Sequence, residues 1–375
     1  MTRVLFLAES DYGNSGRMFM RAAEHAGFDC RGWKAQCHTF GYPDQIKTLP
    51  GAEHATHYPS YAVSLAFLWR DILVTEIERA DIIHVIQSDV PRCIGGTYPP
   101  PGWPDASGQV FYPAGLVPPR GHQVMDMLYE KVVVLQNGGS YYRVARDYYE
   151  QTVWRGVVDC AISHEADLMG SAPWPETLVI PPVDVDFLRD FRADRSGRCK
   201  IVVGHYPGNR VSKGTDSICA AIEMVKDEKW FRDRIEFRRS AFNFMSPVGV
   251  VPVPWRDHLR RLAQCDVVID QIMPELDGKP FGEWCNTALE AATLGCAVIV
   301  NSRDTSPYER TYGRKPDFDI CNTTDEMIDV MKRYAESGGV GAAGHHAQWW
   351  AEDCHSVEAT APIIRDIYTS AMESR

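Results

Sequence analysis

Apolar residues along the chain fall into short continuous runs separated by longer amphipathic stretches. Runs rich in Val, Ile and Leu predict strands, whereas apolar residues spaced three or four positions apart predict helices. In the first half, strands are predicted at Arg3–Ala8, Asp29–Trp33, Asp81–Gln87, Lys131–Gln136, Asp159–Ser163 and Thr177–Ile180. Helices are predicted at Asn14–Ala26 and Val63–Arg79, and from about Tyr141 onward.

The second half repeats this alternation. Strands are predicted at Lys200–Gly204, Arg234–Phe237, Asp266–Ile272 and Ala297–Asn301, and helices at Ser217–Lys226, Arg256–Gln264, Thr287–Leu294, Thr324–Glu336 and Gln348–Ser374. Continuous apolar runs are typical of strands that are covered on both faces, as in parallel sheets flanked by helices. Two such series predict an α/β protein with two doubly wound domains. The break between them is predicted in the proline-rich and charged stretch 181–197.

The composition agrees with two folded domains. The chain has 375 residues, of which 45% are hydrophobic and 24% are charged, and these values are typical of globular proteins. The N-terminus lacks the pattern of a secretory signal, and no apolar run approaches the roughly 20 residues that span a bilayer. The 11 cysteines include no Cys-x-x-Cys pair. We therefore expect reduced thiols and a cytoplasmic protein.

The charge and the histidine spacing weigh against two kinds of site. The net charge of −11 argues against a general nucleic-acid binder, which is normally basic. His54 and His57 lie in a predicted loop, and His345 and His346 lie in a predicted glycine-rich turn. Neither pair offers the convergent ligands that a metal site needs. We therefore predict neither a metal nor a cofactor.

One candidate site follows the predicted strand Lys200–Gly204, where a glycine-containing loop leads into a helix. Ligands of open α/β sheets bind beyond the carboxyl ends of the strands, and a helix N-terminus presents free N–H groups that suit phosphate. Arg210 and Lys213 add two cations in this loop, which favours a phosphate site. The alternative for this segment alone is a solvated basic turn in which Asp216 caps the helix.

A second candidate site follows the predicted strand Asp266–Ile272, where another loop leads into a helix. Glu283 and Glu290 are seven residues apart, and this spacing places both on roughly the same helix face. A carboxylate at this place suits the hydroxyl pair of a ribose, because it can accept two hydrogen bonds. The alternative for either glutamate alone is an exposed charge on a helix.

These two segments together resemble the donor domain of the retaining GT-B glycosyltransferases of the large family four. The family writes its first element as Asn-Arg-x-x-Lys-Gly-(Thr/Ser)-(Asp/Glu), and residues 209–216 match it. Its second element is a strand ending in Asp-Gln, here Asp270-Gln271, followed by Glu-Ala-x-x-x-Gly-x-(Pro/Ala)-Val-Ile, here residues 290–299. The resemblance covers Lys200–Asn301 well, and the rest of the chain only in architecture.

The chain departs from the family pattern at Gly282. The family often has a glutamate there that touches the donor sugar, although some branches carry glycine with an aromatic residue two positions on, as Trp284 stands here. The resemblance implies that Glu290 binds the ribose, and Glu283 is a candidate to replace the missing glutamate.

The resemblance also implies an architecture and a chemistry. Residues 1–182 would form an acceptor-side domain, residues 183–345 a donor domain facing it across a cleft, and residues 346–375 a helix crossing back onto the first domain. Trp349 and Trp350 would be packing anchors of that helix. The reaction would be metal-independent transfer, with retention, of a sugar from a nucleotide diphosphate such as UDP or GDP. In this scheme Arg210, Lys213 and Glu283 are catalytic candidates, and the donor would be bound by Gly13, Asn209, Gly282, Trp284, Cys285, Asn286, Thr287 and Glu290.

Polar and glycine residues at the predicted strand ends of the first domain supply acceptor-side candidates. His84 is a further catalytic candidate, and its alternative is a core histidine with satisfied hydrogen bonds. The acceptor-side candidates are Asp89, Gly139, Ser140 and Arg143. A proline-rich loop at Gly95–Gly121 is equally compatible with a functional role and with a surface excursion.

Several alternatives stay open from the sequence. The acceptor would be a glycan, a small molecule or a modified DNA base. A GT-B fold also suits a nucleotide-sugar epimerase or phosphorylase, and a non-catalytic sugar-nucleotide binder, because a fold does not determine a function. For a DNA-modifying enzyme, Arg238-Arg239 or Arg260-Arg261 would meet the DNA backbone.

Overall fold

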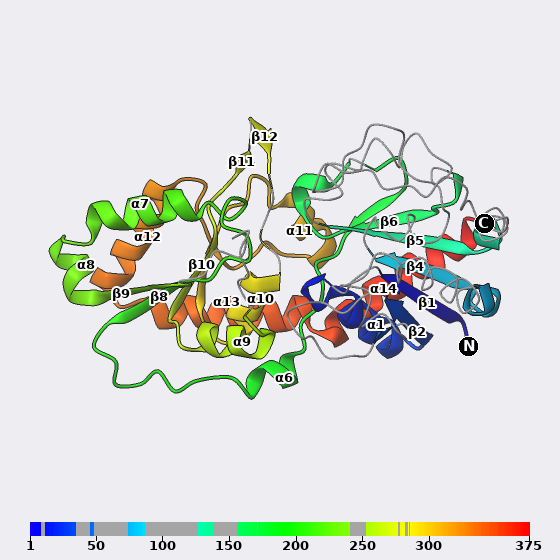
Figure 1. The fold of residues 1–375 in the computed structure, drawn as a ribbon, viewed down its shortest axis with the longest axis horizontal. Helices are drawn as coiled ribbons and strands as arrows, with labels where there is room; N and C mark the ends of the chain where they lie inside the picture. Colours follow the sequence, from blue (N-terminus) through cyan, green and yellow to red (C-terminus); the bar gives the residue numbers. More distant parts are fainter. Residues whose placement is uncertain are drawn as a thin grey trace, which may run out of the picture.

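The computed structural model describes residues 1–8, 12–34, 46–48, 74–86, 127–138, 156–170, 172–240, 253–276, 278–281, 284 and 286–375. Two parallel sheets lie at the two ends of an elongated molecule (Figure 1). Within the described residues the predicted alternation of strands and helices is confirmed, and most element boundaries differ from the prediction by one or two residues. The predicted helix from about Tyr141 and residues 63–73 of the predicted helix Val63–Arg79 lie outside the described residues.

The described residues of the first half form seven strands in the order β3-β2-β1-β4-β5-β6-β7, and neighbouring strands are parallel. These strands are β1 (Arg3–Ala8), β2 (Asp29–Lys34), β3 (Lys47–Thr48), β4 (Ile82–Ile86), β5 (Val132–Asn137), β6 (Cys160–Ser163) and β7 (Glu176–Leu178). The short helices η1 (Tyr12–Asn14) and η4 (Ala166–Leu168) follow β1 and β6. One face of the sheet packs against α1 (Ser15–His25) and α14 (Val357–Glu373), whose Phe19 and Ile364 are fully buried in this core.

The described residues of the second half form a five-stranded parallel sheet in the order β14-β13-β10-β8-β9. Its strands are β8 (Ile201–His205), β9 (Ile235–Arg239), β10 (Val267–Gln271), β13 (Ala297–Val300) and β14 (Asp319–Ile320), and β11 (Glu275–Leu276) with β12 (Lys279–Pro280) forms a separate hairpin. One core contains α7 (Thr215–Val225), α8 (Lys229–Arg234) and α12 (Thr324–Ser337). Another contains α9 (Trp255–Ala263), α10 (Asn286–Thr293), α11 (Ser306–Tyr312) and α13 (Val340–His355). Valines that alternate along β8 and β10 enter opposite cores, as expected for strands buried on both faces.

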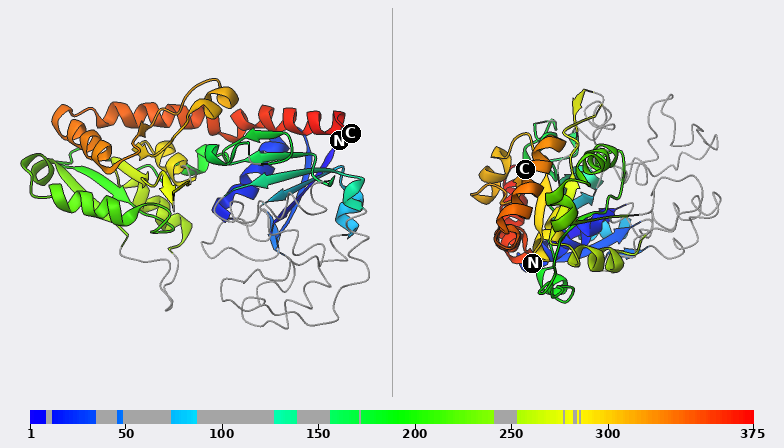
Figure 2. Two further views of the ribbon diagram at one scale, coloured as in Figure 1. Left: turned by 90° about the horizontal axis from the view of Figure 1, so that it is seen from above. Right: turned by 90° about the vertical axis from the view of Figure 1, so that its left-hand side faces the viewer.

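The C-terminal segment is two helices, so the prediction of one helix over Gln348–Ser374 is wrong. α13 ends at His355, Ser356 is extended, and the Ser356 side chain accepts a hydrogen bond from the Ala359 N–H at the start of α14. α13 packs on the second sheet and α14 on the first (Figure 2, left). The chain also passes between the halves at Val183, whose N–H donates to the His355 carbonyl at 2.8 Å.

Three local predictions in this region need correction. His345 and His346 lie inside α13 rather than in a glycine-rich turn. Trp350 is a packing anchor, but it is buried in the core of the second half. Trp349 is 52% exposed, with the Arg314 guanidinium 4.3 Å from its ring centroid. Both tryptophans precede the Ser356 break, which explains why neither reaches the first sheet.

The predicted break near residues 181–197 contains a short helix, α6 (Val185–Arg189), which the sequence reading did not include. Asp184 caps it by accepting from the Phe187 N–H. The same carboxylate pairs with Arg17 at 3.2 Å and with Arg21, both on α1. Asp184 therefore links the connecting segment to the first half.

None of the helices within the described residues combines the length and the apolar character needed to cross a bilayer.

Candidate functional site

The loop between β8 and α7 is held close to the end of β10. The Asn209 side chain accepts hydrogen bonds from the Val211 and Ser212 N–H groups, at 2.9 and 3.2 Å, which makes the turn. Gly214 is left-handed (φ 66°), and a Cβ there would collide with the Ile272 carbonyl oxygen. Only glycine combines this backbone conformation with so close an approach. The sequence Lys-Gly therefore places Lys213 directly against the carboxyl end of β10.

Lys213 forms the central ion pair of the site. Its Nζ donates to both carboxylate oxygens of Asp270, at 3.0 Å each. The Asp270 side chain is 2% exposed and that of Lys213 is 20% exposed. The carboxylate thus holds a partly exposed cation in one place beside the carboxyl ends of β8 and β10, which is where ligands of open α/β sheets bind.

Arg210 lies further out on the same loop. Its Nε donates to Asp216 Oδ1 at 2.5 Å, and the two side chains are 45% and 73% exposed. Asp216 is in the first turn of α7, but the residue at the N-cap position is Gly214, without a side-chain cap. An exposed pair of this kind contributes little to stability.

His205, at the end of β8, supports the loop from below. Its Nδ1 donates to the Ile269 carbonyl at 2.8 Å, so Nε2 accepts from the Thr215 hydroxyl at 2.9 Å. Burial lowers the pKa of His205 to about 4, which keeps the ring neutral near pH 7. Sequence reasoning missed this residue, because a histidine ending an apolar strand gives no signal of its partners.

Glu290 is buried on α10, with 8% of its surface exposed. Its Oε1 accepts from Trp255 Nε1 at 2.7 Å, and its Oε2 lies 4.0 Å from His258 Nε2. Burial raises the pKa of Glu290 to about 7, opposed by the Trp255 hydrogen bond. The exposed helix charge considered as its alternative is therefore wrong. The sequence reading also missed Trp255 and His258, although their spacing of three places both on one face of α9.

The start of α10 touches the first half of the molecule. Asn286 Nδ2 donates to the Gly13 carbonyl, and Thr287 beside it is partly exposed. Gly13 is left-handed (φ 62°), and a Cβ there would collide with the Asn286 amide. The predicted donor-binding residues Gly13, Asn286 and Thr287 therefore lie together at the junction of the two halves.

Two candidates are buried in the protein core. His84 is fully buried, hydrogen bonded through Nδ1 to the Tyr368 hydroxyl at 2.6 Å and through Nε2 to Gln136 Oε1 at 2.9 Å. Burial lowers the pKa of His84 to about 3. It is the satisfied core histidine, and its assignment as catalytic is wrong. The Trp284 side chain is also fully buried and stacks on Tyr308 at 4.8 Å, so it contributes to the core.

The remaining candidates and the proline-rich loop Gly95–Gly121 lie outside the described residues. These candidates are Asp89, Gly139, Ser140, Arg143, Gly282, Glu283 and Cys285.

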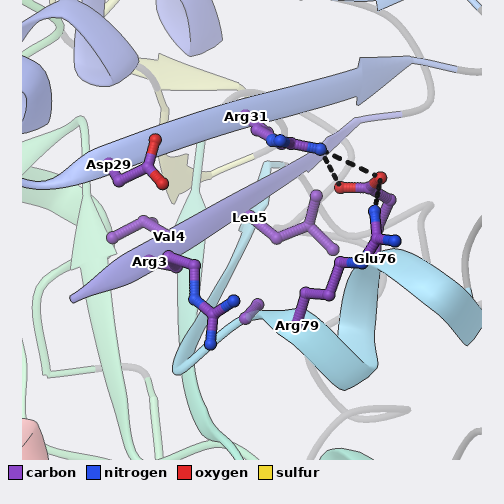
Figure 3. Close-up of a pocket in the computed structure, with 8 residues that line it drawn as sticks. Arg3, Val4, Leu5, Asp29, Arg31, Glu76 and Arg79 are labelled. Atoms are coloured by element: carbon purple, nitrogen blue, oxygen red, sulfur yellow. Dashed lines mark hydrogen bonds and ion pairs between the residues drawn. The ribbon is translucent and has the colours of Figure 1, made fainter. Parts of the chain in front are cut away.

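A small cavity of about 50 Å³ lies where β1 and β2 begin, at the end of the first sheet opposite the carboxyl ends of its strands (Figure 3). Its arginines are paired: Arg31 and Arg79 contact Glu76, and Arg3 contacts Asp81. Small-molecule sites usually measure about 300–1,000 Å³, so this cavity is too small for a sugar nucleotide. Within the described residues, no group of three or more His, Cys, Asp or Glu side chains is arranged to hold a metal ion.

Known proteins resemble this chain in structure but not in sequence. No family model matches the sequence, and no curated protein matches it. The Anabaena protein HepE, solved with UDP and glucose, is 12% identical with a TM-score of 0.56, and the match covers 100% of both chains. An alpha-glucosyltransferase solved with UDP and a 13-mer DNA is 12% identical with a TM-score of 0.59, covering 99% of this chain and 100% of that one. The chain has the GT-B fold.

This result confirms the predicted fold class, an α/β protein with two Rossmann-like parallel sheets. A third structure of the same kind, the α,α-trehalose 6-phosphate synthase from Burkholderia multivorans, is 11% identical with a TM-score of 0.51, covering 100% of this chain and 99% of that one. At these identities the likeness establishes the fold alone, so the function has to be argued from the site.

Proposed function

We propose that the protein is a glycosyltransferase that moves a sugar from a nucleotide diphosphate sugar to an acceptor hydroxyl. Transfer would proceed with retention, and without a metal or cofactor, as in the family-four enzymes that residues 200–301 resemble. The observation that carries the proposal is Lys213, fixed by Asp270 at the carboxyl ends of β8 and β10 with Glu290 in the neighbouring helix. Residues 1–182 would form the acceptor side and residues 183–345 the donor side.

The chemistry needs positive charge at the leaving phosphate. When the bond between the sugar and the diphosphate breaks, negative charge grows on the β-phosphate while the sugar becomes oxocarbenium-like. A preorganised cation stabilises this transition state more than the ground state. Lys213 is such a cation, because Asp270 has already fixed its ammonium group. Arg210 and the N–H groups at the start of α10 would complete the phosphate site, and the departing phosphate would take the acceptor proton.

The structural neighbours support a uridine donor. HepE was solved with UDP-glucose as well as with UDP and glucose, and the alpha-glucosyltransferase was solved with UDP. We expect UDP and UDP-glucose to raise the melting temperature more than GDP, ADP and their sugars do. A ligand at about 100 times its Kd stabilises the folded state by about 2.7 kcal/mol. UMP is the matched control, because it keeps the base and ribose but lacks the β-phosphate. If no nucleotide diphosphate raised the melting temperature, the proposed function would be wrong.

Glu290 predicts how donor use depends on pH. Its carboxylate would accept hydrogen bonds from the ribose hydroxyls, and protonation removes part of that capacity. Because burial raises its pKa to about 7, kcat/KM for the donor should fall as pH decreases below 7, by up to about tenfold per pH unit. Glu290→Gln should lower kcat/KM at pH 8 by about 10- to 100-fold and remove this acidic limb. A variant that keeps the limb would show that another group titrates.

The DNA-modifying alternative is not favoured, although one structural neighbour was solved with DNA. Arg238 donates to Glu236 at 2.7 Å, and Arg260 pairs with Asp257 at 2.5 Å. These arginines are therefore balanced by carboxylates, in a chain of net charge −11. Release of an epimerised free sugar would indicate an epimerase, and donor binding without transfer to any acceptor would indicate a non-catalytic binder.

A further inference from the structure

Polar atoms without partners gather where the strands of the first sheet end. Within the described residues, Asn14 Oδ1, both side-chain polar atoms of Asn137, and His164 Nε2 are buried and have no hydrogen-bond partner. The three residues are 3%, 0% and 6% exposed. A buried polar group left unpaired costs about 1–3 kcal/mol, so such groups are kept where a ligand satisfies them or a special role requires them.

Hydrogen bonds connect the segments that carry these side chains. The His164 N–H donates to the Asn137 carbonyl at 3.0 Å, which joins the end of β6 to the end of β5. Gln136, next to Asn137, donates through Nε2 to the Ser15 hydroxyl at 3.3 Å, and Ser15 follows Asn14. The three side chains therefore come from adjoining segments at one edge of the sheet, the edge where ligands bind in this type of fold.

Asn14 lies beside the donor-side half. Its backbone is left-handed (φ 59°), and it is the one described non-glycine residue with a positive φ. Such strain persists where the surrounding structure requires it, often at functional sites. The preceding residue, Gly13, accepts the hydrogen bond from Asn286 at the start of α10. Asn14 is thus adjacent to the point where the proposed donor helix meets the first half, and the hydrogen bonds above connect its segment to those of Asn137 and His164.

We propose that Asn14, Asn137 and His164 bind a hydroxyl-bearing, uncharged acceptor, a sugar or another polyol. This inference rests on the proposed function. A hydroxyl both donates and accepts, and an amide offers both complements. His164 is neutral, because burial lowers its pKa to about 3, so its Nε2 forms one neutral hydrogen bond. A phosphate or carboxylate would instead be best matched by a cation, which none of these three side chains provides.

Binding of small neutral sugars tests this directly. Saturation-transfer NMR would be recorded on the full chain in the presence of UDP, with glucose, maltose and glycerol as probes. Glucose 6-phosphate and glucuronate would serve as anionic counterparts. The variants are Asn137→Ala, His164→Ala and Asn14→Gly, the last of which keeps the left-handed backbone without strain. Thr360→Val is the matched control, because Thr360 Oγ1 is also buried and unpaired but lies on α14.

We expect at least one neutral probe to bind the wild type, and to bind the three cluster variants at least about tenfold more weakly, as loss of one or two hydrogen bonds implies. Thr360→Val should bind as the wild type does. The Kd of UDP-glucose, measured by calorimetry, should stay within about twofold in every variant. The inference would be overturned if the wild type bound no neutral sugar or preferred the anionic probes. It would also be overturned if the cluster variants bound the neutral probes as the wild type does, or if their binding of UDP-glucose were weakened equally. If the wild type failed to bind UDP-glucose, the proposed function itself would be at fault.

Discussion

Lys213→Met is expected to lower kcat by about 10²- to 10³-fold at saturating donor, which corresponds to roughly 2.7–4 kcal/mol of transition-state stabilisation from one preorganised donor. Methionine keeps the length of the side chain but removes the charge that would meet the leaving phosphate. The effect should appear mainly in kcat, because the charge on the β-phosphate grows during bond cleavage. Arg210→Ala should lose less, since Arg210 is an exposed side chain already paired with Asp216. The measurement is UDP release from UDP-glucose with the acceptor present.

The ion pair with Asp270 demands a control for stability. Removing Lys213 leaves a 2%-exposed carboxylate without its cation, and breaking a buried pair in this way costs about 3–5 kcal/mol. The double variant Lys213→Met with Asp270→Asn removes both charges, so its melting temperature should return toward that of the wild type. Its kcat should stay as low as that of the single variant. Recovery of activity in the double variant, or near-normal turnover in the single one, would disprove a direct role for Lys213.

The sequence predicted the fold because strands buried on both faces have a strong local signature. The apolar runs that became β5 and β10 needed no knowledge of distant partners. The Lys213 loop was predictable for a similar reason, since Gly214 and Asn209 shape it within a few residues. Local sequence could therefore place these candidates after the carboxyl ends of β8 and β10.

The sequence did not reveal the surroundings of a candidate side chain where residues far away in the chain enclose it. His84 is bound by Tyr368, which is 284 positions away, and Trp284 is enclosed by Tyr308 and Trp350. Residue type alone does not reveal such burial. The C-terminal break has the same origin, because Ser356 is compatible with a helix interior and the helix ends where Val183 bonds the His355 carbonyl. The partners of Glu290 were missed because Trp255 is 35 positions away on another helix.

Acid should destabilise the protein steeply below pH 6.5. In the described part of the chain, His84, His164, His205 and His355 are at most 6% exposed. Burial lowers their pKa values to about 3, 3, 4 and 3, against about 6.5 in the unfolded chain. A folded pKa below the unfolded one contributes stability that is present above pH 6.5 and is lost as pH falls toward the folded value. Unfolding between about pH 4 and 6 therefore takes up a proton at each of these histidines.

Glu290 acts in the opposite direction. Its folded pKa of about 7 lies above the value of 4.5 for an ordinary glutamate, so its contribution is full below pH 4.5 and is lost as pH rises through 7. Between these values it releases a proton on unfolding, which offsets the proton taken up by its neighbour His258, whose pKa burial also lowers to about 4. Each remaining proton changes the free energy of unfolding by about 1.4 kcal/mol per pH unit. Four net protons remain, so the free energy of unfolding should decrease by about 5 kcal/mol per pH unit between pH 6 and 5, measured by urea denaturation.

His355 separates this mechanism from general acid denaturation. Among the described residues its ring nitrogens have no hydrogen-bond partner, and the ring packs against Tyr312 and Trp350 at 4.4 and 4.5 Å. His355→Phe keeps an aromatic ring there, removes the buried unpaired nitrogens and abolishes one proton uptake. The variant should be more stable than the wild type at pH 5, with a pH dependence reduced by about 1.4 kcal/mol per pH unit. Equal slopes in the two proteins would mean that His355 does not take up a proton on unfolding. A wild-type free energy of unfolding that is constant from pH 7 to 5 would contradict the lowered pKa values of all the buried histidines, because a neutral buried histidine binds a proton when the chain unfolds in acid.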